Sequence, residues 1–130
     1  MTMINQIAAG LDDGVKPSPD GCEVTLGGGT RRQKVRVDVR GENCRFTSVV
    51  LPAGEVTRTD ERWRQLARIA WQRNVETDVV TFTFDRRHRL IGRIQHPAAT
   101  LDAPELEFYL RTIARECDRF KYLLSGLDCD

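Results

Sequence analysis

The sequence predicts a single α+β domain in which helices pack against an antiparallel sheet, with the element order α-β-β-β-α-β-β-α. Alternating apolar residues mark five short strands, in one group of three and one of two. Apolar residues three or four positions apart mark a helix between the groups and helices at both ends. The length of 130 residues is typical of one domain, so we expect residues 1–130 to form it.

The composition is that of a globular protein with no predicted membrane span. Hydrophobic residues make up 40% of the chain and charged residues 30%. The 20 Lys and Arg nearly balance the 19 Asp and Glu, so net charge does not point to nucleic acid or a membrane as partner. No apolar run reaches the roughly 20 residues that cross a bilayer, and the N-terminus has no signal-peptide pattern. We therefore expect a cytoplasmic protein without a membrane partner.

The first element is a short helix over residues 4–11, where apolar residues fall on one face. Glycines and prolines then predict a loop over 12–21. Three strands follow, at 22–26, 33–40 and 45–51. Their linkers, at 27–30 and 41–43, are short enough for antiparallel hairpins. In the second strand Val35, Val37 and Val39 alternate with charged residues, which indicates one buried and one solvated face.

Pro52 and Gly54 end the preceding strand, and Thr59 or Asp60 can cap the middle helix that follows. This helix is expected to run to about Arg73. Its core-facing side is formed by four residues, Trp63, Leu66, Ala67 and Ala70. Ile69 and Trp71 widen this apolar side beyond one buried stripe. The excess predicts a second contact surface on this helix.

The second hairpin is predicted from strands at 76–84 and 89–95, joined by the turn 85–88. The last helix begins with Asp102 as its cap and Glu105 as the reciprocal partner three residues later. An apolar stripe continues from Leu106 to Leu124. Gly126 is predicted to stop this helix, and residues 127–130 to form a mobile tail.

This order of elements resembles the type III secretion chaperone-like fold. The segments that carry the resemblance are Trp63 to Trp71, the hairpin VVTFTFDRRHRLIGRIQHP, the connector TLDAPEL and the helix FYLRTIARECDRFKYLLSG. That family includes secretion chaperones and YbjN-like proteins described as sensory regulators. The resemblance covers nearly the whole chain and implies a homodimer that offers sheet and helix surfaces to a partner polypeptide. Secretion chaperones tend to be acidic, whereas this chain is nearly neutral, which favours a regulatory or adaptor role.

No chemical motif predicts catalysis, a cofactor or a metal. The triple glycine before Thr30 lacks the lysine of a phosphate-binding loop and lies between two strands, so a hairpin turn is the better interpretation. His88 and His96 have no accompanying ligand pair. The four cysteines, Cys22, Cys44, Cys117 and Cys129, have no C-x-x-C spacing, and we expect reduced thiols. Cys22 and Cys44 would be a reactive pair only if their strands were neighbours, with basic residues lowering the pKa of Cys44.

Two basic clusters leave a nucleic-acid accessory protein open as the alternative function. The residues of this possible basic surface are Lys34, Arg36, Arg40, Arg86, Arg87, Arg89 and Arg93. Such a row could follow a phosphate backbone. Aromatic residues are scarce on the polar faces, however, and single-strand binders stack bases on such rings. A solvated sheet face is therefore favoured over nucleic-acid binding.

The favoured function is a protein-binding module without catalytic activity, a chaperone or regulatory adaptor. The predicted partner or dimer surface consists of Trp63, Ile69, Trp71, Phe108 and Tyr122, which exceed the needs of one small core. Some of these residues would close a symmetric homodimer. The others, with an exposed sheet edge, would hold a partner segment as an added strand or a docked helix.

Overall fold

The structure is a computed structural model that describes residues 14–26 and 31–128. The helix predicted at 4–11, the linker at 27–30 and Cys129 lie outside the described residues. The described elements are β1 (Val15–Ser18), β2 (Gly21–Leu26), β3 (Arg31–Arg40), β4 (Asn43–Leu51), α2 (Ala53–Val56), α3 (Asp60–Glu76), β5 (Thr81–Phe84), β6 (Leu90–Pro97), η2 (Ala98–Thr100) and α4 (Ala103–Asp128). The predicted α+β fold class, with an antiparallel sheet and helices packed on it, is confirmed.

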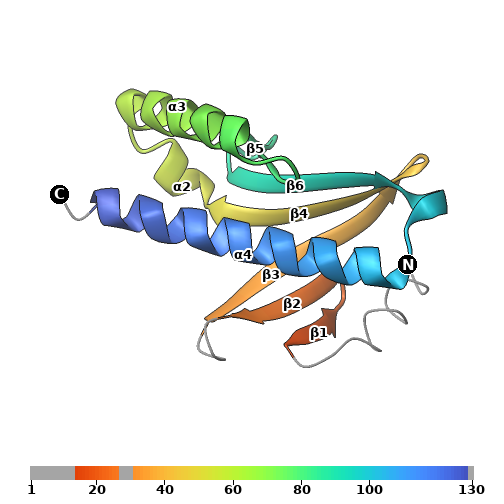
Figure 1. Ribbon diagram of the computed structural model, residues 1–130. Coiled ribbons are helices and arrows are strands. Elements are labelled where there is room, and N and C mark those ends of the chain that lie inside the picture. Colours follow the sequence, from red (N-terminus) through yellow and green to blue (C-terminus); the bar gives the residue numbers. More distant parts are fainter. Residues whose placement is uncertain (1–13, 27–30, 129–130) are drawn as a thin grey trace.

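The strands form one antiparallel sheet in the order β1-β2-β3-β4-β6-β5. The long helix α4 crosses one face of this sheet, and α3 lies beside β5 at one end of the strand order (Figure 1). The other face of the central strands is uncovered by any described helix (Figure 1). We call it the open face. No helix among residues 14–26 and 31–128 is long and apolar enough to span a membrane.

The alternation of β3 decides which face is buried. Val35 and Val37 are buried under α4, but Val39, predicted to continue this buried row, is 50% exposed near the end of the strand. Lys34, Arg36 and Arg40 are exposed on the open face. The helix supplies a continuous stripe to this core, with Leu106, Leu110, Ile113, Ala114, Cys117, Phe120 and Leu124 all buried. The core therefore lies between α4 and the sheet, and the polar side chains of β3 face solvent.

The loop predicted at 12–21 is wrong in its middle, because Val15–Ser18 forms the edge strand β1. The Thr25 backbone N–H donates to the Gly14 carbonyl at 2.7 Å, and the Val15 side chain is buried. Pro17 is tolerated because an edge strand has an outer side where a missing N–H costs no ladder bond. Pairing with β2 thus overrides a local composition typical of a loop.

The boundary between α3 and β5 also differs from the prediction. Helix α3 continues to Glu76, and the strand predicted from that residue begins only at Thr81. The Thr77 backbone N–H donates to the Arg73 carbonyl at 3.1 Å, and its hydroxyl donates to the Val80 carbonyl at 2.9 Å. These bonds satisfy the helix end and use residues 77–80 as a connection.

The two ends of α4 test the predicted helix signals. The capping box is confirmed, since the Glu105 N–H donates to Asp102 Oδ1 at 2.8 Å and the Asp102 N–H to Glu105 Oε1 at 3.3 Å. The stop at Gly126 is wrong, because α4 includes Gly126 and ends at Asp128. Residues 127 and 128 are therefore helical where a tail was predicted. A glycine costs only about 1 kcal/mol within a helix, so it does not by itself end one.

Candidate binding surfaces

Helix α3 carries an exposed apolar ridge at its C-terminal end. Trp71 is 68% exposed and Val75 69%, and the two lie one helical turn apart on the same side. Val79, just after the helix, is 39% exposed. We call these three residues the α3 ridge. Large apolar side chains in such continuity indicate a contact surface.

The five predicted surface residues do not form one patch. Trp63 is half-exposed and its ring packs on Phe84, with centroids 4.2 Å apart. Ile69 is half-buried against the core, so it belongs to the packing of α3 on the sheet. Phe108 is exposed near the start of α4, and Tyr122 is exposed near its end. Phe108 and Tyr122 lie about 21 Å apart along α4 and therefore belong to separate surfaces.

A hollow of about 460 Å³ lies where the end of α4 passes the β2–β3 hairpin. Its lining residues are Leu26, Arg31, Arg115, Asp118, Arg119, Tyr122 and Leu123. We call it the α4 hollow. Arg31 Nε donates to Asp118 Oδ2 at 3.0 Å across it, which ties β3 to the helix. The exposed side chains of Tyr122 and Leu123 give it an apolar wall, with arginines at the rim.

The two sheet edges are poorly suited to adding a strand. Edge strand β1 has four residues and contains Pro17, which has no N–H to donate. At the opposite edge, the Phe82 N–H donates to Asn74 Oδ1 at 2.7 Å and Asn74 Nδ2 donates to the Phe82 carbonyl at 2.9 Å. The Asn74 side chain thus occupies the backbone groups that a further strand would need.

The two basic clusters of the sequence meet on the open face. Around a hollow of about 370 Å³ stand Arg36, Arg40, Arg45, Arg86, Arg87, Arg89 and Arg93, together with Asp38 and Asp85. We call these seven arginines the arginine face. Strand pairing explains the convergence, because Thr47 lies opposite both Arg36 and Arg93 in the register. Lys34 lies on the same strand face but outside this hollow.

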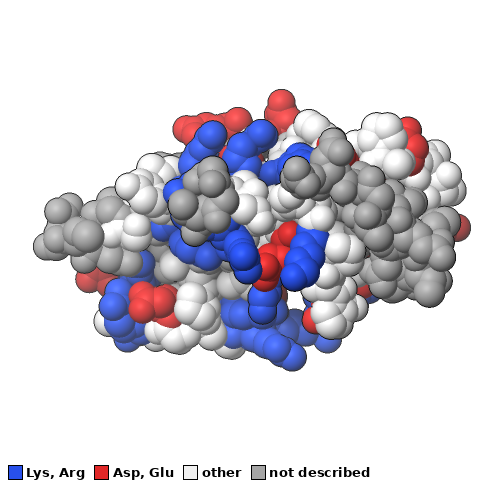
Figure 2. All heavy atoms as spheres, turned by 90° about the horizontal axis from the view of Figure 1, so that it is seen from below, with Lys and Arg blue, Asp and Glu red and all other residues white. Residues whose placement is uncertain are grey.

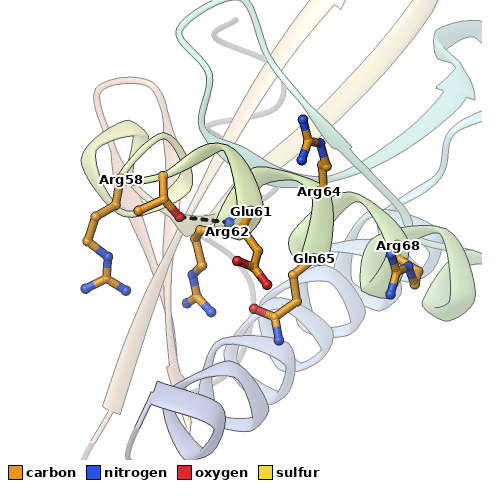
Figure 3. Close-up of a pocket in the computed structure, with 7 residues that line it drawn as sticks. Arg58, Glu61, Arg62, Arg64, Gln65 and Arg68 are labelled. Carbon is orange, nitrogen blue, oxygen red and sulfur yellow. Dashed lines mark hydrogen bonds between the residues drawn. The ribbon is translucent and has the colours of Figure 1, made fainter.

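Basic side chains are prominent elsewhere too. Figure 2 views the molecule from the β1 edge and shows Lys and Arg over much of that surface, with Asp and Glu between them. On α3, a hollow of about 690 Å³ is lined by Arg58, Thr59, Glu61, Arg62, Arg64, Gln65 and Arg68. Arg58, Arg62 and Gln65 point to one side of the helix, and Arg64 points to the other (Figure 3). These arginines therefore do not converge on one point.

Asp85 organises the turn at the end of the arginine face. Its Oδ1 accepts from the backbone N–H groups of Arg87 and Arg89 at 3.0 and 2.9 Å, and its Oδ2 accepts from Arg89 Nε at 2.7 Å. Burial alone would raise the pKa of Asp85, but these hydrogen bonds and the Arg89 charge outweigh it, so the pKa is lowered. The turn holds His88 at a φ of 63° with its side chain exposed.

His96 is a structural residue between β6 and α4. Its Nδ1 lies 2.8 Å from the Tyr109 hydroxyl and its Nε2 lies 3.1 Å from Thr100 Oγ1. Glu105 Oε2 lies 3.8 Å from Nε2. Within residues 14–26 and 31–128, no group of three or more His, Cys, Asp or Glu side chains could hold a metal ion.

The described cysteines are free and buried, as predicted for small core residues. Strand β3 separates β2 from β4, so Cys22 and Cys44 are not on neighbouring strands and form no reactive pair. The idea that basic residues lower the pKa of Cys44 is wrong, because burial and the Asp38 charge raise it. Burial also raises the pKa of Cys22, and that of Cys117 to about 12.

Several contact residues were missed from the sequence. Val75 and Val79 extend the ridge beyond Trp71, and the expected helix end at Arg73 hid their relation to it. Helical spacing of four from Trp71 would have found Val75. Leu123 had no distinguishing local pattern, because only the packing of α4 beside the β2–β3 hairpin places it in a hollow.

The sequence matches no known family model and no curated protein. Solved structures are similar in fold. A chain of the HopA1–SchA chaperone–effector complex is 10% identical with a TM-score of 0.57, covering 93% of this chain and 91% of that one. A chain of the ExsC–ExsE complex is 17% identical with a TM-score of 0.58, and the match covers 95% of this chain and 94% of that one. A chain of the complex of the Yersinia pestis type III secretion chaperone SycH with a fragment of YscM2 is 13% identical with a TM-score of 0.52. This match covers 92% of this chain and 97% of that one. The chain therefore has the type III secretion chaperone-like fold.

Proposed function

We propose that this protein is a non-catalytic binding module that holds a partner polypeptide and acts as a homodimer. The observation that carries the proposal is the exposure of large apolar side chains on a domain whose core is already complete: Trp71, Val75 and Tyr122 are each about two-thirds exposed or more, at 68%, 69% and 72%. Solvent contact of such side chains is unfavourable by about 25 cal/mol per Å² of apolar surface, so a partner that covers them gains that free energy.

The similar solved structures support a protein partner, because two of them are complexes of a chaperone with another protein. Within this fold, a regulatory or adaptor role of the YbjN-like kind fits the chain better than a secretion role. Its net charge of +1 and its arginine face differ from the acidic character of secretion chaperones. We propose that it works in the cytoplasm.

Surface shape suggests how the two contacts are divided. Two residues of the α3 ridge, Trp71 and Val75, lie one turn apart on the helix, and such a convex apolar row can pair with its own copy about a two-fold axis. The α4 hollow is concave and combines an apolar wall with arginines, which suits an inserted amphipathic segment. We therefore assign dimerisation to the ridge and partner binding to the hollow.

Single charge insertions test this division. The Trp71→Glu protein is expected to elute as a monomer in size-exclusion chromatography with light scattering, because the glutamate must desolvate at the dimer contact. The Tyr122→Glu protein is expected to remain a dimer but to lose the polypeptide captured by the wild type from a lysate of the source cells, as identified by mass spectrometry.

Gln72→Glu is the matched control, since Gln72 is exposed on α3 beside Trp71. This variant is expected to behave as the wild type in both assays. A monomeric wild-type protein would refute the homodimer, and identical capture by the wild type and Tyr122→Glu would refute the role of the hollow. The nucleic-acid alternative gains no support from the similar structures.

A further inference from the structure

We propose that the arginine face binds an acidic segment of the partner polypeptide, with Arg45 and Arg93 as its central contacts. This inference rests on the proposed function, since it assigns a second binding site for the same kind of partner. It differs from the apolar contacts of the α3 ridge and the α4 hollow in position and in chemistry.

The charges on this face are out of balance. Seven arginines line the hollow, against two aspartates. Asp38 lies 3.6 Å from both Arg36 Nε and Arg40 Nε, and Asp85 is bound to Arg89. No described carboxylate pairs with the side chains of the other four, Arg45, Arg86, Arg87 and Arg93. An anionic ligand would offset this local excess of positive charge.

The side chains of Arg45 and Arg93 are less exposed than those of the turn arginines Arg86 and Arg87. Both side chains are partly buried, and the Nε atom of each is buried without a hydrogen-bond partner among the described residues. Because the Nε atoms are closed to solvent, a ligand can reach these two guanidinium groups only through their Nη atoms. Carboxylates satisfy guanidinium groups best, because two parallel N–H···O bonds can form between the planar groups.

The arrangement of the face matches an extended peptide. Arg93 and Arg45 lie on the adjacent strands β6 and β4, displaced by two residues along the strands, because Thr47 pairs with Arg93 and Arg45 with Gln95. Alternate residues of a strand are about 6.8 Å apart on one face, which is also the spacing of alternate side chains in an extended ligand. A hollow of about 370 Å³ admits only a short segment of such a chain.

A peptide fits this face better than a nucleic acid does. Asp38 lies among Arg36, Arg40 and Arg45, where it repels phosphate and carboxylate groups alike but can accept hydrogen bonds from peptide N–H groups, which a nucleic-acid backbone does not offer. The aromatic residue in the lining, Phe84, packs on Trp63 and is not available as a platform for bases. The face therefore combines donors for carboxylates with an acceptor for a peptide backbone.

The test is a titration followed by fluorescence anisotropy, with a fluorescein-labelled peptide of alternating glutamate and serine. The same peptide with glutamine in place of glutamate and a labelled oligothymidylate are the comparison ligands. The proteins are the wild type, Arg45→Gln/Arg93→Gln, and the control Arg64→Gln/Arg68→Gln, which removes the same charge from exposed arginines of α3. Circular dichroism and thermal unfolding establish that each variant is folded.

The glutamate peptide is expected to bind the wild type and to bind the Arg45/Arg93 variant about tenfold or more weakly. The Arg64/Arg68 variant is expected to stay within about twofold of the wild type. Should the Arg45/Arg93 variant fail to fold, the variant Arg86→Gln/Arg87→Gln, in an exposed turn, replaces it and is expected to bind the glutamate peptide more weakly than the wild type.

Three results would overturn the inference: no binding of the glutamate peptide, an equal loss in both arginine pairs, or tighter and equally Arg45-dependent binding of oligothymidylate. The proposed function fails by a different route. Trp71→Glu and Tyr122→Glu, added to the same titration, are expected to bind the peptide like the wild type. If the wild type captures its partner but does not bind the glutamate peptide, only the proposed arginine site is refuted. If it binds the peptide but captures no partner through the apolar surfaces, only the proposed apolar contacts are refuted.

Discussion

Gly92 of β6 lies directly beneath Cys117 of α4, so closely that a methyl group added at Gly92 would come within 2.5 Å of the Cys117 sulfur. Val80 and Phe82 close the same site at 3.1 and 3.3 Å. The absence of a side chain at Gly92 thus sets how near α4 can approach the sheet. This approach also buries the Cys117 thiol completely.

Gly92→Ala is expected to lower the free energy of unfolding by about 1–3 kcal/mol, because the added methyl overpacks the contact with α4. Urea denaturation measures the change. Gly54→Ala is the control, because no atom lies within 4 Å of a Cβ built at Gly54, and it is expected to be neutral or slightly stabilising. Equal stability of Gly92→Ala and the wild type would contradict the close packing.

Replacement of Asn74 by alanine is expected to destabilise the protein by about 1–3 kcal/mol, because the backbone groups of Phe82 lose both their partners. The Phe82 amide is expected to exchange with solvent faster, which hydrogen exchange by NMR can measure. Gln72→Ala serves as the control on the exposed side of α3. Unchanged protection of the Phe82 amide would show that the side chain does not cap the edge.

The turn after β5 is expected to depend on pH through Asp85. Because the pKa of this carboxyl is lowered in the folded protein, its charged form stabilises the fold above the unfolded pKa of about 3.9. That contribution is lost as the pH falls through the folded pKa. The difference in unfolding free energy between the wild type and Asp85→Asn is therefore expected to shrink from about pH 7 to about pH 3.

The control for this pH dependence is Asp78→Asn, at an exposed position in the connection before β5. Its difference from the wild type is expected to be small and nearly constant with pH. A constant difference for Asp85→Asn as well would mean that the hydrogen bonds, and not the charge, account for the role of Asp85.

Thiol chemistry gives a separate measure of the core. In a Cys129→Ser protein, Cys22, Cys44 and Cys117 are expected to resist a disulfide reagent at mildly alkaline pH, because burial keeps each thiol protonated and inaccessible. All three are expected to react once denaturant is added. Rapid labelling of any of them in the native protein would contradict the packing of the sheet against α4.

Local sequence signals were reliable where the chemistry is local. The reciprocal hydrogen bonds of Asp102 and Glu105 join residues only three positions apart. The alternation of Val35 and Val37 with charged residues likewise involves only neighbours in the chain. Local signals were unreliable where a distant segment decides. Val15–Ser18 is a strand because its residues pair with those of β2.

The sequence by itself determined the α+β class, the strands β2, β3 and β4, and the start of α4. Side-chain periodicity and helix capping depend on residues within a few positions of each other. Only the tertiary structure decided that Tyr122 joins Leu26 in one hollow and that Arg45 joins Arg93 in another. The reason is physical: strand register and helix placement bring together residues far apart in the chain, and no local pattern contains that information.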